Sequence, residues 1–352
     1  MTKPMRFANI LIIKPSALGD VVHALPVLTA LRNRFADAKI TWMIRREFAP
    51  LLDCVPGLDE RLLFERKQLG RWYTGQGLTA MRSLIEQLRT ANYDLILDLQ
   101  GLLRTALLGW LSGCPTRVGM ANAREGAPLF YTHRVKPPAG SLHMVDRYRT
   151  LLEAIGIETF DPRNPLRPPA KAAEYASVML NEAGLTPGRF AVLIAGSAHP
   201  SKCWPTERFA AVAEKLAKQY GLKIAAVGTA GEKKIVSTIQ QACAVPIADF
   251  CGRTSIPQLA ALLTQAGLVV SNDTGPGHIA AAIGVPTVLI FGPTNPAWVA
   301  PYGRPETVVA IEPNNRGTSV RSHNPKHRID HISISMVMDA VAGQLHSVGG
   351  RQ

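Results

Sequence analysis

Residues suited to binding an anion gather between positions 269 and 286, in the segment VVSNDTGPGHIAAAIGVP. An apolar run ends at Val270, a polar turn follows, and small residues at helical spacing begin near His278. Such a turn leaves backbone amides unpaired at a helix N-terminus, where the helix dipole also favours negative charge. Gly275 and Gly277 carry no Cβ atoms where a ligand would have to approach the backbone. The segment therefore predicts a phosphate site.

Three side chains of this turn could take part in binding. Thr274 offers a hydroxyl and His278 a ring N–H to the same phosphate oxygens. Asp273 is unsuited to a phosphate, so we expect it to orient the loop or to bind a sugar hydroxyl. The alternative is an ordinary strand–turn–helix connection with a capping aspartate.

Two further turns follow apolar runs in the same half of the chain. In IAGSAHPSKCW (194–204), Lys202 could reach a diphosphate as a point charge, or it could be a surface lysine. In VGTAGE (227–232), Glu232 is suited to ribose hydroxyls, as in nucleotide-binding α/β folds. The turns at 194–204 and 269–286 are both suited to phosphate and lie in one domain, so each strengthens the prediction of a phosphate site at the other.

An acidic residue lies at a comparable turn near the start of the chain, in IKPSALGDVVHALP (13–26). Asp20 could cap the helix that follows, or it could act as a general base on a hydroxyl nucleophile. His23 is the rival base, although one helical turn further on it could simply be packed.

Basic side chains accumulate in the first half of the chain, at Arg66, Lys67 and Arg71 beside two aromatic residues, and again at Arg124. Such stretches suit nucleic acid, an anionic sugar or a membrane surface. No motif of a nucleic-acid-reading module accompanies them, so nucleic acid is the least favoured of the three.

Short apolar runs alternate with segments of helical period along the whole chain, which indicates parallel sheets covered on both faces. Strands are expected at 8–13, 40–44, 95–97, 191–194, 224–227, 268–270 and 287–291. The helices are expected at 21–35, 80–91, 102–111, 171–183, 206–220, 232–242, 257–265 and 278–283, with a last amphipathic helix at 332–345.

Four prolines within DPRNPLRPPA (161–170) mark the best linker in the sequence. We therefore expect an N-terminal domain over 1–165, a C-terminal domain over 166–331, and a terminal helix and tail over 332–352; the family resemblance described below implies that the first binds an acceptor and the second a donor. Ligands should bind at the carboxyl ends of the strands, facing the crevice between the domains.

Composition and charge indicate the kind of ligand and the compartment of the protein, and they exclude a membrane-spanning segment. The chain has 352 residues and a net charge of +13, which divides into +7 for residues 1–165 and +6 for the rest, so anionic ligands are expected in both halves. Five widely spaced cysteines fit a reducing compartment, and the N-terminal apolar run is too short for a signal peptide. Residues 274–303 lack charge but contain five prolines and five glycines, which exclude a membrane span.

The polar segment 314–331 contains three histidines, His323, His327 and His331. A metal site there is less favoured than a solvated loop, because the segment has no helical pattern, cysteine or paired carboxylates. We expect a cytoplasmic protein without a bound metal or cofactor.

Two long segments, KPSALGDVVHALPVLTALR (14–32) and SNDTGPGHIAAAIGVPTVLIFGPTNP (271–296), resemble the lipopolysaccharide heptosyltransferases of glycosyltransferase family 9. LDLQGLLRTALL, GMANAREGAPLFY and KCWPTERFA follow in the order and spacing of that family. The middle segments are most similar to heptosyltransferase I. The resemblance implies an α/β fold of GT-B type, with two Rossmann-like doubly wound domains facing across a cleft.

The resemblance also implies an activity, the transfer of heptose from ADP-heptose to the Kdo sugar of lipid A by an inverting, metal-independent reaction. It implies peripheral contact with the cytoplasmic face of the inner membrane and no nucleic-acid partner. The residues that it places at the catalytic, donor and acceptor sites are, respectively, Asp20; Ser197, Lys202, Glu232, Asp273, Thr274, Gly275 and His278; and Arg66, Lys67 and Arg124.

Three other activities remain open. A heptosyltransferase II or another nucleotide-sugar transferase would share the fold and differ in its acceptor. A nucleotide-sugar epimerase would release nucleotide without any acceptor, and a non-catalytic protein would bind ADP and turn nothing over.

Overall fold

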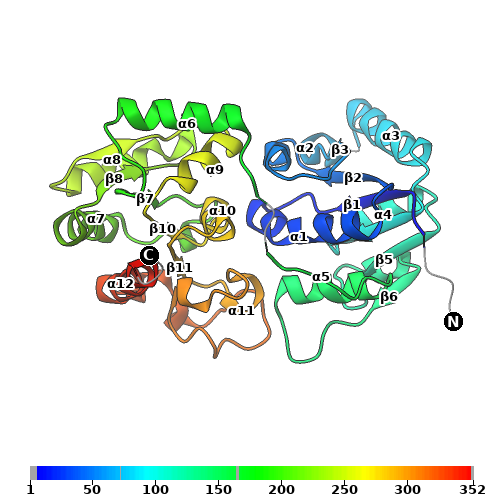
Figure 1. The fold of residues 1–352 in the computed structure, drawn as a ribbon. Helices are drawn as coiled ribbons and strands as arrows, with labels where there is room; N and C mark the ends of the chain where they lie inside the picture. The colour runs from blue at the N-terminus through cyan, green and yellow to red at the C-terminus, as the bar shows by residue number, and fades with distance from the viewer. Residues whose placement is uncertain (1–5, 72, 164–165, 350–352) are drawn as a thin grey trace. The chain divides into compact units, whose positions relative to one another are not determined.

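The computed structural model describes residues 6–71, 73–163 and 166–349. The chain divides into two compact units, residues 1–165 and residues 166–352 (Figure 1). Each unit contains one six-stranded parallel sheet with helices around it.

In the first unit the strands follow the order β3-β2-β1-β4-β5-β6. Their bounds are β1 Asn9–Ile13, β2 Lys39–Ile44, β3 Glu60–Leu63, β4 Leu95–Asp98, β5 Thr116–Met120 and β6 His133–Val135. The helices are α1 Leu18–Arg34, α2 Arg66–Leu69, α3 Gly75–Thr90, α4 Leu103–Leu111 and α5 Met144–Glu153.

The second unit repeats this arrangement with the order β12-β11-β10-β7-β8-β9. Its strands are β7 Phe190–Ile194, β8 Lys223–Ala226, β9 Ile247–Asp249, β10 Leu268–Asn272, β11 Thr287–Phe291 and β12 Val308–Ala310. Its helices are α6 Ala170–Glu182, α7 Thr206–Tyr220, α8 Lys233–Ala242, α9 Ile256–Thr264, α10 Gly275–Ile283, α11 Pro296–Val299 and α12 Ile334–Gly349.

Both sheets therefore have the strand order of dinucleotide-binding α/β folds. In each sheet the order in which successive strands are added changes direction once, although all strands are parallel. The reversal lies between β1 and β4 in the first unit and between β10 and β7 in the second. Loops diverge at such a reversal, which leaves room for a ligand at the carboxyl ends of the two strands. The predicted doubly wound α/β architecture is confirmed.

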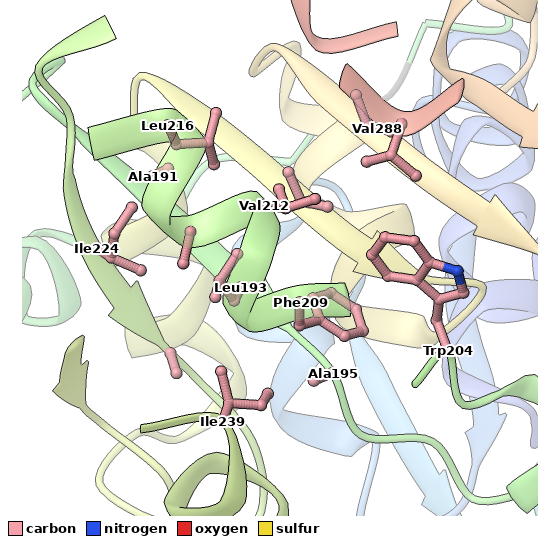
Figure 2. Packing of buried hydrophobic residues seen from close by; sticks show 14 of the residues in the cluster. Ala191, Leu193, Ala195, Trp204, Phe209, Val212, Leu216, Ile224, Ile239 and Val288 are labelled. Carbon is pink, nitrogen blue, oxygen red and sulfur yellow. The ribbon is translucent and has the colours of Figure 1, made fainter. Parts of the chain in front are cut away.

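The central strands are built from the apolar runs, and their residues are buried on both faces. All five residues of β7 and all five of β11 are buried. In the second unit Trp204 and Phe209 pack edge-to-face, with ring centroids 5.2 Å apart, beside α7 residues such as Val212 (Figure 2). This packing fixes the chain directly after Lys202, so the core of the unit also positions its candidate site.

Three helices begin several residues earlier than the sequence predicts. α1 begins at Leu18 and α10 at Gly275, each three residues before its expected start, and α3 begins at Gly75, five residues early. Their first turns contain glycine, proline and aspartate, which are typical of loops but are also accepted in the first turn of a helix.

The segment 314–331 is a largely exposed loop, as the sequence predicts, but two of its polar side chains are buried. Arg316 is 7% exposed and donates hydrogen bonds to the carbonyl oxygens of Gly292, at 2.5 Å, and Thr294, at 2.8 Å. His327 is 3% exposed, with Nδ1 2.6 Å from Ser322 Oγ. Buried polar side chains therefore anchor this segment to the loop after β11.

Residues 274–303 contain α10, β11 and α11. Among the helices of the described residues, none is both long enough and apolar enough to cross a membrane.

Candidate active site

A buried ionic cluster lies at the sheet reversal of the second unit. Asp273 directly follows β10, and its Oδ2 lies 2.6 Å from Lys202 Nζ. Its Oδ1 lies 3.0 Å from His278 Nε2 on the first turns of α10. Lys202 comes from the segment after β7 and His278 from the helix after the neighbouring strand β10, and Asp273 contacts both of them at the N-terminus of α10.

The charge of Asp273 depends on these two partners. The side chain is 4% exposed, and burial alone would raise its pKa. The hydrogen bond from His278 and the positive charge of Lys202 oppose burial and hold the pKa of Asp273 well below its usual range. Lys202 has three N–H donors, so a lysine bound to Asp273 can still donate to phosphate oxygens.

The two glycines of this turn serve different purposes. A Cβ atom on Gly275 would meet nothing within 4 Å, whereas one on Gly277 would lie 2.5 Å from Leu289 Cδ2 and from Ser271 Oγ. The prediction that both glycines open the backbone to a ligand is therefore wrong for Gly277, which allows α10 to pack on the sheet. Gly275 lies beside Thr274, the N-cap residue of the helix, and both are partly exposed.

Glu232 lies beside the turn that follows β7, although it follows β8 in sequence. Its Oε2 accepts hydrogen bonds from Thr229 N at 2.6 Å and Thr229 Oγ1 at 2.9 Å. A Cβ atom on Gly196 would overlap the Glu232 carboxylate. Ser197, the next residue, is partly exposed, so the carboxylate and this serine lie on adjacent parts of the same edge of the sheet.

Asn272 connects these loops and was not singled out from the sequence. It is fully buried, its Nδ2 donates to Ala195 O at 2.6 Å, and its Oδ1 accepts from Trp204 N at 3.1 Å. An asparagine at the end of an otherwise apolar strand was the available signal, because a buried amide needs partners.

In the first unit Asp20 is the third residue of α1, at the matching sheet reversal. Its Oδ2 accepts a hydrogen bond from Ala17 N at 3.3 Å and lies 3.5 Å from Lys14 Nζ. The side chain is 33% exposed, so the carboxylate both caps the helix and remains open to solvent. The rival base His23 is 7% exposed and packs edge-on against His143, with ring centroids 5.5 Å apart.

A second buried carboxylate, Asp98, ends β4 and organises the neighbouring loop. It accepts hydrogen bonds from the amides of Gln100 and Gly101 and from the hydroxyls of Thr105 and Tyr131. Burial raises the pKa of Asp98, and these hydrogen bonds offset part of the effect. The sequence analysis assigned no role to this residue, which shapes the loop beside Asp20.

The predicted acceptor residues lie on exposed segments of the first unit. Arg66 and Lys67 open α2, directly after β3, and Leu69 anchors that short helix in the core. Arg124 follows β5, and its amide donates to Gly101 O at 3.2 Å. Four strand spacings separate β3 from β5, about 19 Å at ordinary spacing, so the two basic groups lie on the same edge of the sheet without contact.

The model of glycosyltransferase family 9 (heptosyltransferase) matches residues 81–328, which is more than half of the chain. The chain belongs to glycosyltransferase family 9. It is therefore a glycosyltransferase, and the resemblance seen in its sequence motifs is confirmed.

Curated relatives of this glycosyltransferase cover most of its length. It is 26% identical to the lipopolysaccharide core heptosyltransferase OpsX of Haemophilus influenzae, over 97% of both chains. It is 30% identical to lipopolysaccharide heptosyltransferase 1 of Pseudomonas aeruginosa, over 84% of this chain and 82% of the relative.

Solved structures share the fold of this family 9 enzyme. The family 9 glycosyl transferase of Veillonella parvula aligns with a TM-score of 0.80 at 24% identity, over 98% of this chain and 99% of that one. The Escherichia coli heptosyltransferase WaaC, solved with ADP-2-deoxy-2-fluoro heptose, aligns with a TM-score of 0.75 at 24% identity, over 95% and 99%.

Within the described parts of the chain, no group of three or more His, Cys, Asp or Glu side chains is placed to hold a metal ion. His327 lies 3.4 Å from Glu312 Oε2 and pairs with Ser322, so its polar contacts are those of a packed side chain.

Proposed function

We propose that this enzyme transfers L-glycero-D-manno-heptose from ADP-heptose to a Kdo sugar of lipid A, in the synthesis of the lipopolysaccharide inner core. The observation that carries the proposal is the Lys202–Asp273–His278 cluster at the N-terminus of α10, in a chain of the heptosyltransferase family. The names of the curated relatives, and the heptose nucleotide in the WaaC structure, support the donor class.

The second unit would bind the donor. Lys202, Thr274, His278 and the backbone at Gly275 would hold the diphosphate, with Ser197 close by, and Glu232 would bind the ribose. Asp273 would set the positions of Lys202 and His278. Donors fixed in advance where charge develops are usually the largest contribution to catalysis, and here they would stabilise the ADP that leaves.

The first unit would activate the acceptor. Asp20 would take the proton of a Kdo hydroxyl while that oxygen attacks the anomeric carbon of heptose. The bond from this carbon to the diphosphate oxygen breaks, ADP departs with the electron pair, and the anomeric configuration inverts. We propose that no metal ion takes part, since Lys202, His278 and the helix amides can offset the charge of the diphosphate.

Arg66, Lys67 and Arg124 would meet the anionic groups of the acceptor. The acceptor is a lipid, so we propose that the enzyme works at the cytoplasmic face of the inner membrane and associates with it peripherally. Relatives at similar identity include a lipooligosaccharide heptosyltransferase 2 and a lipopolysaccharide heptosyltransferase 3, so the test has to compare acceptors.

The test measures ADP release from ADP-heptose, with Kdo-lipid A or with heptosylated Kdo-lipid A, in the presence and absence of EDTA. We expect ADP release that depends on Kdo-lipid A, a product heavier by one heptose, and no effect of EDTA. The product's anomeric configuration, read by NMR, should be the opposite of the donor's.

Each other outcome has a distinct meaning. Turnover only with the heptosylated acceptor would replace the proposed acceptor and keep the donor. Loss of turnover in EDTA would contradict metal independence. ADP release at the same rate without any acceptor would favour hydrolysis or epimerisation, and absence of ADP-heptose binding would overturn the donor site.

A further inference from the structure

Lys14 is a buried lysine that contacts the proposed base. It follows β1 directly and is 2% exposed. Its Nζ lies 3.5 Å from Asp20 Oδ2 and donates to the carbonyl oxygen of Leu99 at 3.4 Å. Lys14 thus joins the two loops that diverge at the sheet reversal of the first unit.

The main chain fixes the place of this lysine. Its amide donates to Met43 O at 3.3 Å, and its carbonyl oxygen accepts from the indole N–H of the buried Trp42 at 3.2 Å. The ammonium group therefore extends from a rigid strand end and does not move with a surface loop.

A buried ammonium group usually does little to stabilise a folded protein. Removing the charge from water costs several kcal/mol, and an ion pair often fails to repay that cost relative to an apolar residue of similar size. The four residues that precede Lys14, Ile10 to Ile13, are apolar and fully buried. A lysine at this position is therefore better explained by its effect on Asp20.

We propose that Lys14 is a positioning residue that holds the Asp20 carboxylate for proton transfer, an inference that rests on the proposed function. Ala17 N and Lys14 Nζ both contact Oδ2. With Oδ2 held from two sides, Oδ1 is the oxygen that receives the proton of the acceptor hydroxyl. The lysine keeps its own proton throughout and transfers nothing.

Orientation is the way in which Lys14 would act on the reaction, because a displacement of about 1 Å can reduce turnover about 100-fold. Neutralising Lys14 should therefore slow the reaction and not accelerate it.

The first experiment is a double-mutant cycle on turnover with the variants K14M, D20N and K14M/D20N. Lys14→Met should lower kcat about 10- to 100-fold and leave the KM for ADP-heptose within about twofold. The double variant should be about as active as Asp20→Asn alone, because a residue that acts through Asp20 has no further effect once the base is lost. Lys39→Met is the matched control, since Lys39 is an exposed lysine of the same sheet, paired with Glu60 at 2.5 Å.

The second experiment is chemical rescue of Lys14→Ala. Ethylammonium ions can occupy the space of the missing side chain and should restore part of kcat. Ethanol, which is similar in size and uncharged, should not restore it. Neither K14M, which fills the space, nor D20N should respond to the amine. Circular dichroism spectra and ADP affinities matching the wild-type protein would show that the variants are folded.

The outcomes separate the inference from the proposed function. Losses that multiply in the double variant, turnover of Lys14→Met equal to or above wild type, or absence of rescue in a folded Lys14→Ala protein would each overturn the role of Lys14. A wild-type protein that releases no ADP with either acceptor would overturn the proposed function itself, and the role of Lys14 with it.

Discussion

The ionised carboxylate of Asp273 contributes both to the stability of the second unit and to the arrangement of the proposed donor site. Burial raises its pKa, and the hydrogen bond from His278 with the charge of Lys202 more than reverses this, leaving the pKa well below its usual range. A carboxyl group whose pKa is lower in the folded protein stabilises the fold above about pH 4. That contribution is lost as the pH falls further and the folded carboxylate takes up a proton.

The expected consequence is a pH-dependent cost of Asp273→Asn. At pH 7 the substitution should lower the free energy of unfolding by about 2 kcal/mol, less than the roughly 3–5 kcal/mol typical of breaking a fully buried pair, because Lys202 is partly exposed. The cost should shrink below about pH 4. Urea unfolding of both proteins from pH 3 to pH 8 measures it, with Asp339→Asn, on an exposed position of α12, as control. A cost that is constant with pH would contradict the assigned ionisation.

The elements that the sequence predicts are those with a continuous apolar run or a clear helical period. The bounds of the central strands β1, β7 and β11 and of the helix α7 were predicted to within one residue. The edge strands β3 (ERLL) and β6 (HRV) were not, because an edge strand needs little apolar character and gains its place from pairing with a neighbour.

In the candidate site, the position of each loop could be predicted from the sequence, but the contacts between loops could not. Its loops could be placed after strands from the sequence, since carboxyl ends of parallel strands share one edge. The contact between Lys202 and Asp273, 71 positions apart, depends on which strands are neighbours. The contact of Lys14 with Asp20 was missed because a lysine directly after a strand is usually solvated.

At the scale of the elements, the packing of α10 predicts different effects on stability for substitutions at two of its glycines. Gly277→Ala should destabilise the second unit by about 1–3 kcal/mol, because the new Cβ would push on Ser271 and Leu289. Gly275→Ala meets nothing in the protein and should leave stability within about 0.5 kcal/mol of the wild type. It should weaken ADP binding about tenfold if a phosphate approaches this backbone.

Thermal unfolding and calorimetric titration with ADP distinguish the two glycine variants. Gly231→Ala is a suitable control, since its Cβ would make only an ordinary contact with Thr229, at 3.8 Å. Unchanged ADP affinity in Gly275→Ala would mean that the nucleotide does not approach the N-terminus of α10.

At the scale of the whole molecule, the positive charge is distributed over both units, in a chain of net charge +13. A charge excess divided in this way fits two anionic substrates, a nucleotide diphosphate for one unit and an acidic lipid for the other. The exposed Arg66 and Lys67 would then have a second role beside the proposed acceptor binding, because basic residues near an anionic bilayer contribute about 1 kcal/mol each to association.

This role predicts salt-sensitive binding of the protein to anionic vesicles. Reversing both charges in R66E/K67E should weaken binding to phosphatidylglycerol vesicles at least tenfold, measured by flotation at low and high salt. The matched control K215E/K218E changes the net charge equally on an exposed face of α7, in the other unit. If the two double variants lose affinity equally, net charge alone attracts the protein to the membrane. If neither lipid charge nor salt changes binding of the wild type, the electrostatic basis of the association is wrong, and the acceptor has to be recognised through its sugars and phosphates alone.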